Sequence, residues 1–339
     1  MSGTGLLQSV AYAIVASKGF YALFLGVLTI PFFQNQVIYL SSVTLTWFQD
    51  VTVPEQWGFL HNQVTPFTLR TSDGETLHAW HILPLGLYQE HEEELLAEPA
   101  GVAEDFRETL GFKLLRDDPD SLLRGFGSSS GSPSEEGLLI DAITLAEWAM
   151  EEAGIPPSRI VLFSQSIGTA VSVALAHHMA TKPEPVLFSG MVLVAPFVDV
   201  ELLTATYRVA GIIPILDPIA RFPRLLAYLN SFILSNEGPK YHVNIIHAED
   251  DYDIPWTHSE QVFWHAVNAS TTGGITFGEL EKKKAASRST RGAGGWVVEH
   301  SGGRGLIREE ITKYGLHDRI MSYPVVSAAV LRGFESSVA

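Results

Sequence analysis

The sequence predicts an α/β fold with a mostly parallel, doubly wound sheet. Short apolar runs at 159–163, 191–194 and 243–247 indicate buried strands, and helical segments alternate with them. This alternation is typical of a parallel sheet covered by helices on both faces. A small-residue turn around Ser166 follows the first of these strands directly, which is a second feature of such folds.

The bulk composition supports a large core and excludes several kinds of site. Of the 339 residues, 46% are hydrophobic and 18% are charged, so a sizeable core can be buried. A net charge of −16 argues against a nucleic-acid partner, because phosphate binding needs a basic surface. The chain has no cysteine, which excludes disulfides, thiolate zinc sites and a cysteine nucleophile. His177 and His178 are helix neighbours that point to different faces, so we expect neither a metal site nor a cofactor.

The first 60 residues have a composition of their own. Between Leu6 and Phe33 the only charged residue is Lys18, and a spanning helix needs about 20 apolar residues. We therefore expect an N-terminal transmembrane helix and stalk over 1–60, followed by the globular domain over 61–339. A signal peptide or an interfacial helix is the alternative for this segment.

The globular domain begins with a predicted hairpin and continues into a predicted helix. The runs 64–69 and 77–83 indicate two strands joined by a turn at Ser72-Asp73-Gly74. Ser134 can cap a following helix, and Gly154 can end it.

Two segments are predicted to lie outside the regular layers. The apolar, proline-containing segment 197–234 is typical of a helical cap over a pocket. The segment 271–295 contains a lysine run and many Gly and Ser residues, so we expect a flexible surface insertion there.

The turn at Ser166 predicts a nucleophile. Ser164 and Gly168, two residues before and after it, are small enough for the strand and the helix to approach closely. A serine at such a strand-to-helix turn is the nucleophile position of the α/β-hydrolase fold, in which the acid and then the histidine follow along the chain. The alternative is a merely structural serine.

The acid candidates follow the strand at 243–247. Asp251 lies four residues before Pro255 and is the preferred candidate, with Asp250 and Asp253 as alternatives. A solvated acidic turn without a catalytic role is the remaining interpretation.

The histidine candidate is His317, which lies past the last predicted strand, at 296–299. His258 and His265 follow the acid too closely, and His300 directly ends a strand. In this arrangement His317 takes the proton of Ser166 and later protonates the leaving group, and Asp251 fixes its tautomer.

Together these motifs resemble the ABHD12/Bem46 group of membrane-anchored serine hydrolases. The resemblance extends over nearly all of the chain from about residue 60 and rests on Pro66 to Gly74, His78 to Pro84, Arg124 to Gly127, the Ser166 turn, His247 to Asp251, and Gly315 to His317. It implies a single-pass membrane enzyme of the endoplasmic reticulum or another endomembrane that hydrolyses lipid esters such as monoacylglycerol or lysophospholipid. By motif match it assigns catalysis to Ser166, Asp251 and His317.

The chain departs from this family at one point. The family has a strand ending in His-Gly, which contributes an oxyanion donor, and a second strand that leads into the Arg-Gly-Phe-Gly loop. Here the chain passes through Leu122-Leu123 straight to Arg124-Gly125. We therefore expect central strands to be missing, the strand at 159–163 to have an open edge, and the N–H of Ile167 to be the only remaining oxyanion donor. A catalytically impaired variant, or a membrane protein that only binds a lipid or a partner, is the alternative function.

Overall fold

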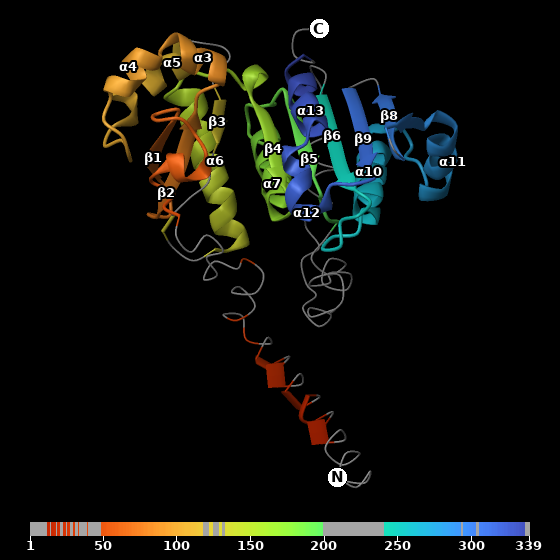
Figure 1. The fold of residues 1–339 in the computed structure, drawn as a ribbon. Helices are drawn as coiled ribbons and strands as arrows, with labels where there is room; N and C mark the ends of the chain where they lie inside the picture. Colours follow the sequence, from red (N-terminus) through yellow and green to blue (C-terminus); the bar gives the residue numbers. More distant parts are fainter. Residues whose placement is uncertain are drawn as a thin grey trace.

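The computed structural model describes most of the globular domain. The described residues are 49–117, 122–124, 129–130, 133–198, 241–292, 294–302 and 305–335, together with separate residues between 12 and 39. Within them the strands form two sheets, one of order β1-β2-β3 and one of order β4-β5-β6-β9-β8-β7 (Figure 1).

The first sheet is a small antiparallel one. Its strands are β1 (Val64–Arg70), β2 (Thr76–Ile82) and β3 (Leu122–Arg124). The predicted hairpin is confirmed, because β1 and β2 pair antiparallel across a turn in which Gly74 has a φ of 91°. The helices near this sheet in the chain are α3 (Leu85–Glu90), α4 (Glu92–Ala97) and α5 (Leu110–Asp117).

The second sheet is the mostly parallel one that the sequence predicts. Strands β4 (Val161–Gln165), β5 (Gly190–Val194), β6 (Tyr241–Ala248) and β9 (Gly305–Thr312) pair in parallel. Strands β8 (Gly295–Gly302) and β7 (Ser289–Arg291) extend the sheet in antiparallel fashion.

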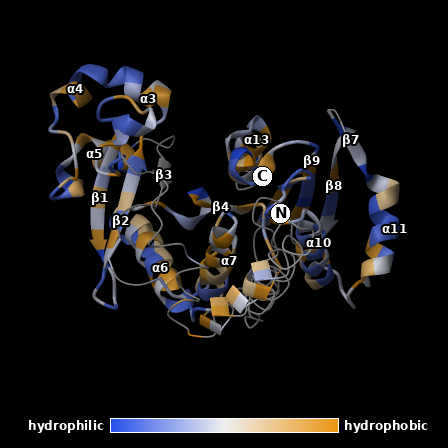
Figure 2. Cartoon of the chain, turned by 60° about the horizontal axis from the view of Figure 1, so that its bottom comes forward, coloured by the Kyte–Doolittle hydropathy of each residue, from blue (hydrophilic) through white to orange (hydrophobic). Residues whose placement is uncertain are grey.

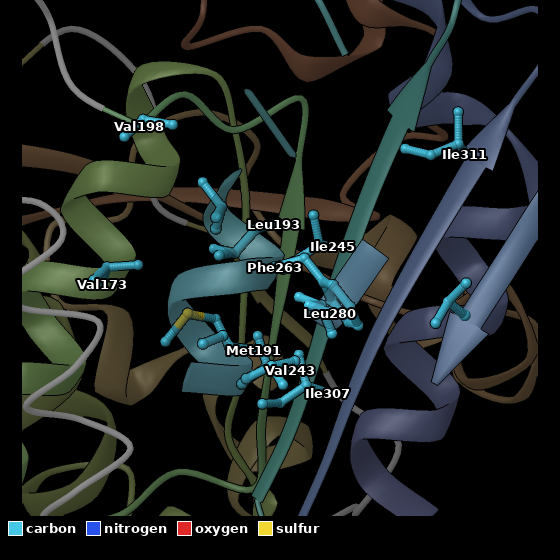
Figure 3. Packing of buried hydrophobic residues seen from close by; sticks show 14 of the residues in the cluster. Val173, Met191, Leu193, Val198, Val243, Ile245, Phe263, Leu280, Ile307 and Ile311 are labelled. Carbon is cyan, nitrogen blue, oxygen red and sulfur yellow. The ribbon is translucent and has the colours of Figure 1, made fainter. Parts of the chain in front are cut away.

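Helices cover both faces of the second sheet. On one face, α7 (Ile167–Ala180) and α10 (Thr257–Ser270) pack on the strands, and Val173 and Phe263 meet Met191, Leu193 and Ile245 there (Figure 3). On the other face, α13 (Pro324–Glu335) packs on β5 and β6 through a second cluster: Val192, Val194, Ile246, Ala248, Ile320, Val326 and Ala329. The doubly covered sheet is therefore confirmed.

Helix α6 (Glu135–Glu151) connects the two sheets. The Ser134 side chain accepts a hydrogen bond from the Gly137 N–H at 3.0 Å, as the predicted cap requires. Hydrophilic and hydrophobic residues mix along the helix (Figure 2). Trp148 packs among Phe67 and Phe106 of the first unit, whereas Ala146 packs with Leu175 of α7. Packing through α6 thus joins a hairpin unit to the main sheet.

The structure differs from the sequence prediction at 271–295. Instead of a flexible insertion, it has helix α11 (Phe277–Ser287) and strand β7. Thr276 and Glu279 form a reciprocal capping box at the start of the helix. Lys284 is buried and pairs with Glu309 on β9 at 2.9 Å, which fixes the helix on the sheet.

The predicted gap in the sheet coincides with a break between β3 and β4. Contrary to expectation, Leu122 to Arg124 do form a strand, which pairs with β2, so the strand that leads into the loop is present in a short form. Within the described part of the chain no strand lies between β3 and β4, and β4 is an edge strand of the second sheet. Phe163 on β4 is accordingly 40% exposed.

Two predicted segments lie mainly outside the described residues. Most of the 197–234 segment is one of them, and most of the N-terminal 1–48 segment is the other. The described residues include no helix that is long and apolar enough to cross a membrane.

Candidate active site

Ser166 lies at a sharp turn between β4 and α7. Its φ of 51° and ψ of −124° are outside the regions that residues other than glycine prefer, at a cost of about 1–3 kcal/mol. Its N–H donates to the carbonyl of Val194 on β5 at 3.0 Å, which holds the turn against the sheet. A Cβ at Gly168 would lie 3.5 Å from Cβ of Ser164, which is van der Waals contact, so the strand and the helix approach each other closely at these two small residues.

Three parallel strands bring the predicted site residues to one edge of the sheet. Ser166 directly follows β4, Asp251 comes three residues after the end of β6, and His317 comes five residues after the end of β9. The carboxyl ends of parallel strands meet at the same edge, which is where ligands bind in open α/β sheets.

Asp251 and His317 are in direct contact. The Oδ2 atom of Asp251 lies 2.8 Å from Nδ1 of His317, and Asp251 is only 5% exposed. The other oxygen, Oδ1, accepts the N–H groups of Asp253 at 3.0 Å and Ile254 at 2.8 Å. Of the three acid candidates, Asp251 is the one whose carboxylate meets His317.

The two alternative acids have other positions. Oδ1 of Asp250 accepts the N–H of Leu316 at 2.9 Å and so binds the backbone of the loop that bears His317. Asp253 contributes its N–H to Asp251, and its own pKa is raised by burial.

The pKa shifts of the pair follow from this geometry. Burial disfavours the charged form of His317, but the hydrogen bond and the charge of Asp251 outweigh it and raise the pKa of His317 above its ordinary value. Burial likewise opposes the charge of Asp251, yet the hydrogen bonds from His247 and His317 hold the pKa of that carboxyl well below its usual range. An ionised acid beside a basic imidazole is the electrostatic state that a general base needs.

The serine turn and the histidine loop are joined through Gln165. Its side-chain amide donates to the backbone carbonyl of His317, and this bond connects the end of β4 to helix α12 (Leu316–Arg319). Leu316 has a φ of 49°, so the histidine loop is also locally strained. Among the described residues, no hydrogen bond joins Oγ of Ser166 to the His317 ring.

Sequence reasoning overlooked two residues at this site, Gln165 and His247. His247 is the penultimate residue of β6, is fully buried, and contacts Asp251 Oδ2 through Nε2 at 3.1 Å. A histidine at the end of a predicted buried strand, four residues before the acid candidate, was the available signal for it.

The N–H of Ile167 opens helix α7 next to Ser166 and is the predicted oxyanion donor. In the described part of the chain, no group of three or more His, Asp or Glu side chains could hold a metal ion.

Comparisons with known proteins agree with this fold. No family model matches the chain. It is 23% identical over 273 residues to lysophosphatidylserine lipase ABHD12 of Danio rerio, covering 72% of this chain and 69% of that protein. It is 33% identical over 156 residues to protein ABHD12B of Homo sapiens, covering 43% and 40%, and 28% identical over 182 residues to protein bem46 of Schizosaccharomyces pombe, covering 50% and 58%.

A solved structure supports the same conclusion. The crystal structure of an alpha-beta hydrolase from Vibrio vulnificus superposes with a TM-score of 0.53 at 17% identity, covering 90% of this chain and 94% of that one. At this identity the similarity concerns the fold alone. The chain is thus a homologue of ABHD12, ABHD12B and Bem46 and has the α/β-hydrolase fold.

Proposed function

We propose that this protein is a serine hydrolase of carboxylic esters that uses Ser166, Asp251 and His317. The observation that supports it best is the hydrogen-bonded Asp251–His317 pair at the sheet edge where the strained Ser166 turn also lies. Nucleophile, acid and base occur in the chain order of α/β-hydrolases.

The proposed reaction proceeds through an acyl-enzyme. Nε2 of His317 takes the proton of the Ser166 hydroxyl while Oγ attacks the ester carbonyl carbon, and the N–H of Ile167 donates to the resulting oxyanion. When the carbon–oxygen ester bond breaks, His317 returns the proton to the leaving alcohol. Water, deprotonated by His317, then attacks the acyl-enzyme, releasing the carboxylic acid and restoring the Ser166 hydroxyl.

The proposed substrates are lipid esters, such as a monoacylglycerol or a lysophospholipid. The support is the homology to proteins that include a lysophosphatidylserine lipase. We further propose that the apolar segment Leu6 to Phe33 attaches the protein to an endomembrane, with Lys18 as its only charge. Sedimentation with membranes after alkaline carbonate washing would test this attachment, and release into the supernatant would contradict it.

A fluorophosphonate probe tests the serine chemistry directly. We expect the full chain to be labelled at Ser166, and Ser166→Ala to lose labelling and ester hydrolysis by about 10³-fold or more. Ser270→Ala is the matched control, because this serine lies at the end of α10 and its hydroxyl donates to the Val267 carbonyl. Full labelling of the Ser166→Ala protein would exclude Ser166 as the nucleophile.

The open edge of β4 favours a second candidate function, a catalytically impaired lipid-binding or partner-binding protein. In the described chain no strand lies between β3 and β4. The strand whose following turn would carry the second oxyanion donor is therefore absent from these residues. One missing donor costs about 2.7–4 kcal/mol of transition-state stabilisation. A version of the chain with a family His-Gly strand inserted before Leu122 should then label at least about 10²-fold faster. Equal labelling rates would contradict the impaired function.

A further inference from the structure

The buried surroundings of Asp251 include a second imidazole. Oδ2 of Asp251 lies 2.8 Å from His317 Nδ1 and 3.1 Å from His247 Nε2, so two histidines share one carboxylate oxygen. His247 approaches from the end of β6 and is 0% exposed. Unlike His317, it has no path to a substrate at the surface.

The contacts of His247 fix which of its nitrogens bears hydrogen. Nε2 is 2.9 Å from the carbonyl oxygen of Ile254 as well as 3.1 Å from Asp251. Both partners are acceptors, so Nε2 must be the donor to both, whatever the charge of the ring. Nδ1 contacts Oγ of Ser259 on α10 at 2.7 Å, which holds the ring plane from the other side.

We propose that His247 is a positioning residue for the hydrolase reaction: it fixes the Asp251 carboxylate and shares Oδ2 with His317, thereby weakening the hold of Asp251 on the His317 proton. This inference rests on the proposed function. Asp251 accepts four donors, two on each oxygen, and each donor disperses the negative charge that faces His317. Removing the His247 donor returns that charge to His317 and makes its imidazole more basic.

The other charges near the pair do not duplicate this role. The ionisable groups that act on His317 are Asp251 and Asp253 from the loop after β6 and Asp318 from α12. Those with the largest effect on Asp251 are the two histidines, and the charges of Asp251 and Asp253 also repel each other. His247 is therefore the donor side chain that adjusts Asp251 without touching the reacting atoms.

The test measures the pKa of His317 by imidazole NMR in the full chain, with the signal identified by its loss in His317→Asn. We expect His247→Phe to raise this pKa by about 0.5 unit, which lowers the neutral fraction, and hence probe labelling at pH 6, about threefold. His247→Gln, whose amide can replace the Nε2 donor, should restore the wild-type value. His61→Gln, at the exposed pair with Glu55 before the first sheet, is the matched control and should change nothing.

An unchanged His317 pKa in folded His247→Phe would overturn the proposal, and so would a shift of equal size in His247→Gln. If His247→Phe does not fold, Ser259→Ala takes its place: it frees the ring at Nδ1 and should raise the pKa by a smaller amount, about 0.2 unit, whereas no shift overturns the proposal. The NMR measurement needs no turnover. A wild-type protein that titrates as expected but is never labelled at Ser166 would contradict the proposed hydrolase function and leave the His247 contact standing.

Discussion

The three-stranded and the six-stranded sheet differ in what they bury. The core of the first unit is aromatic, with Phe67 stacked on Phe106 at 4.3 Å between ring centroids. Even its buried His81 is uncharged, since burial lowers the pKa of that ring to about 3. The buried Asp, Glu, Lys and Arg residues among those described all belong to the second sheet or to elements packed on it: Asp251, Lys284, Arg308, Glu309 and Glu310.

The first sheet therefore contributes mainly apolar packing, whereas the second sheet also holds the charged groups. A sheet with parallel strands and helices on both faces can surround charges with partners, because groups from several elements converge at one position. The antiparallel hairpin unit supplies apolar contact through α6, and its described residues include no buried Asp, Glu, Lys or Arg. Changes in the first sheet should therefore affect stability alone, and changes in the second should affect stability or the site according to position.

The largest effect on stability is expected from Phe67→Ala. Phe67 is 1% exposed, and its removal should lower the free energy of unfolding by about 3–5 kcal/mol, as measured by urea denaturation. Probe labelling of Ser166 in the folded protein should stay unchanged. Leu85→Ala, at a position 60% exposed, is the control with a small expected effect. A Phe67→Ala protein that is as stable as wild type but is labelled more slowly would contradict the statement that the first sheet affects stability alone.

Lys284→Met should destabilise the far side of the second sheet by about 3 kcal/mol, because it leaves the buried Glu309 without its cation. Burial already raises the pKa of Glu309 to about 7, although Lys284 opposes this. A carboxyl whose pKa is raised on folding destabilises the folded protein as pH rises through that pKa. The stability lost in Lys284→Met should therefore be larger at pH 8 than at pH 5. Thermal melts at both pH values measure this. Lys283→Met, exposed on the same helix, is the matched control, and equal losses for the two lysines would contradict the role of Glu309.

Ser134→Ala should cost about 1 kcal/mol, because it removes the cap of the helix that joins the two sheets. Urea denaturation gives the value. Ser287→Ala, whose hydroxyl bonds an exposed carbonyl within α11, should cost less than about 0.5 kcal/mol. A Ser134→Ala cost no larger than that of Ser287→Ala would show that α6 is held by its packing alone.

The smallest effect is expected from Asp253→Asn. The Asp253 charge contributes to the raised pKa of His317, so its removal should lower that pKa by about 0.3 unit. Labelling decreases as pH falls through the His317 pKa, and this decrease should move to lower pH. Asp105→Asn, at the surface pair with Arg107, should leave the pH profile unchanged, and a shift toward higher pH in Asp253→Asn would reverse the assigned sign.

Sequence patterns predicted the apolar part of the second sheet and missed its charged part. Strands β4, β5 and β6 are apolar runs, so periodicity and length were sufficient to find them. Strand β9 contains Arg308-Glu309-Glu310, which no strand pattern suggests, because their ion-pair partners lie on β8, α11 and α13. The same long-range pairing explains why α11 was mistaken for a flexible segment.

The candidate site shows the same division. Chain order and local spacing led to Ser166, Asp251 and His317. The contact of Gln165 with the His317 carbonyl joins residues 152 positions apart in the chain, whereas His247 lies only four residues before Asp251. A single sequence contains no record of the long-range contact of Gln165, whereas the spacing of His247 is visible in the sequence and only its burial is not.

The positive φ of Ser166 has a consequence for protein engineering. Glycine would adopt φ 51° and ψ −124° without the penalty that serine incurs. A directed-evolution experiment that selects for heat resistance alone would therefore favour Ser166→Gly and discard the nucleophile. Stabilising this scaffold requires a screen that scores turnover in the same round.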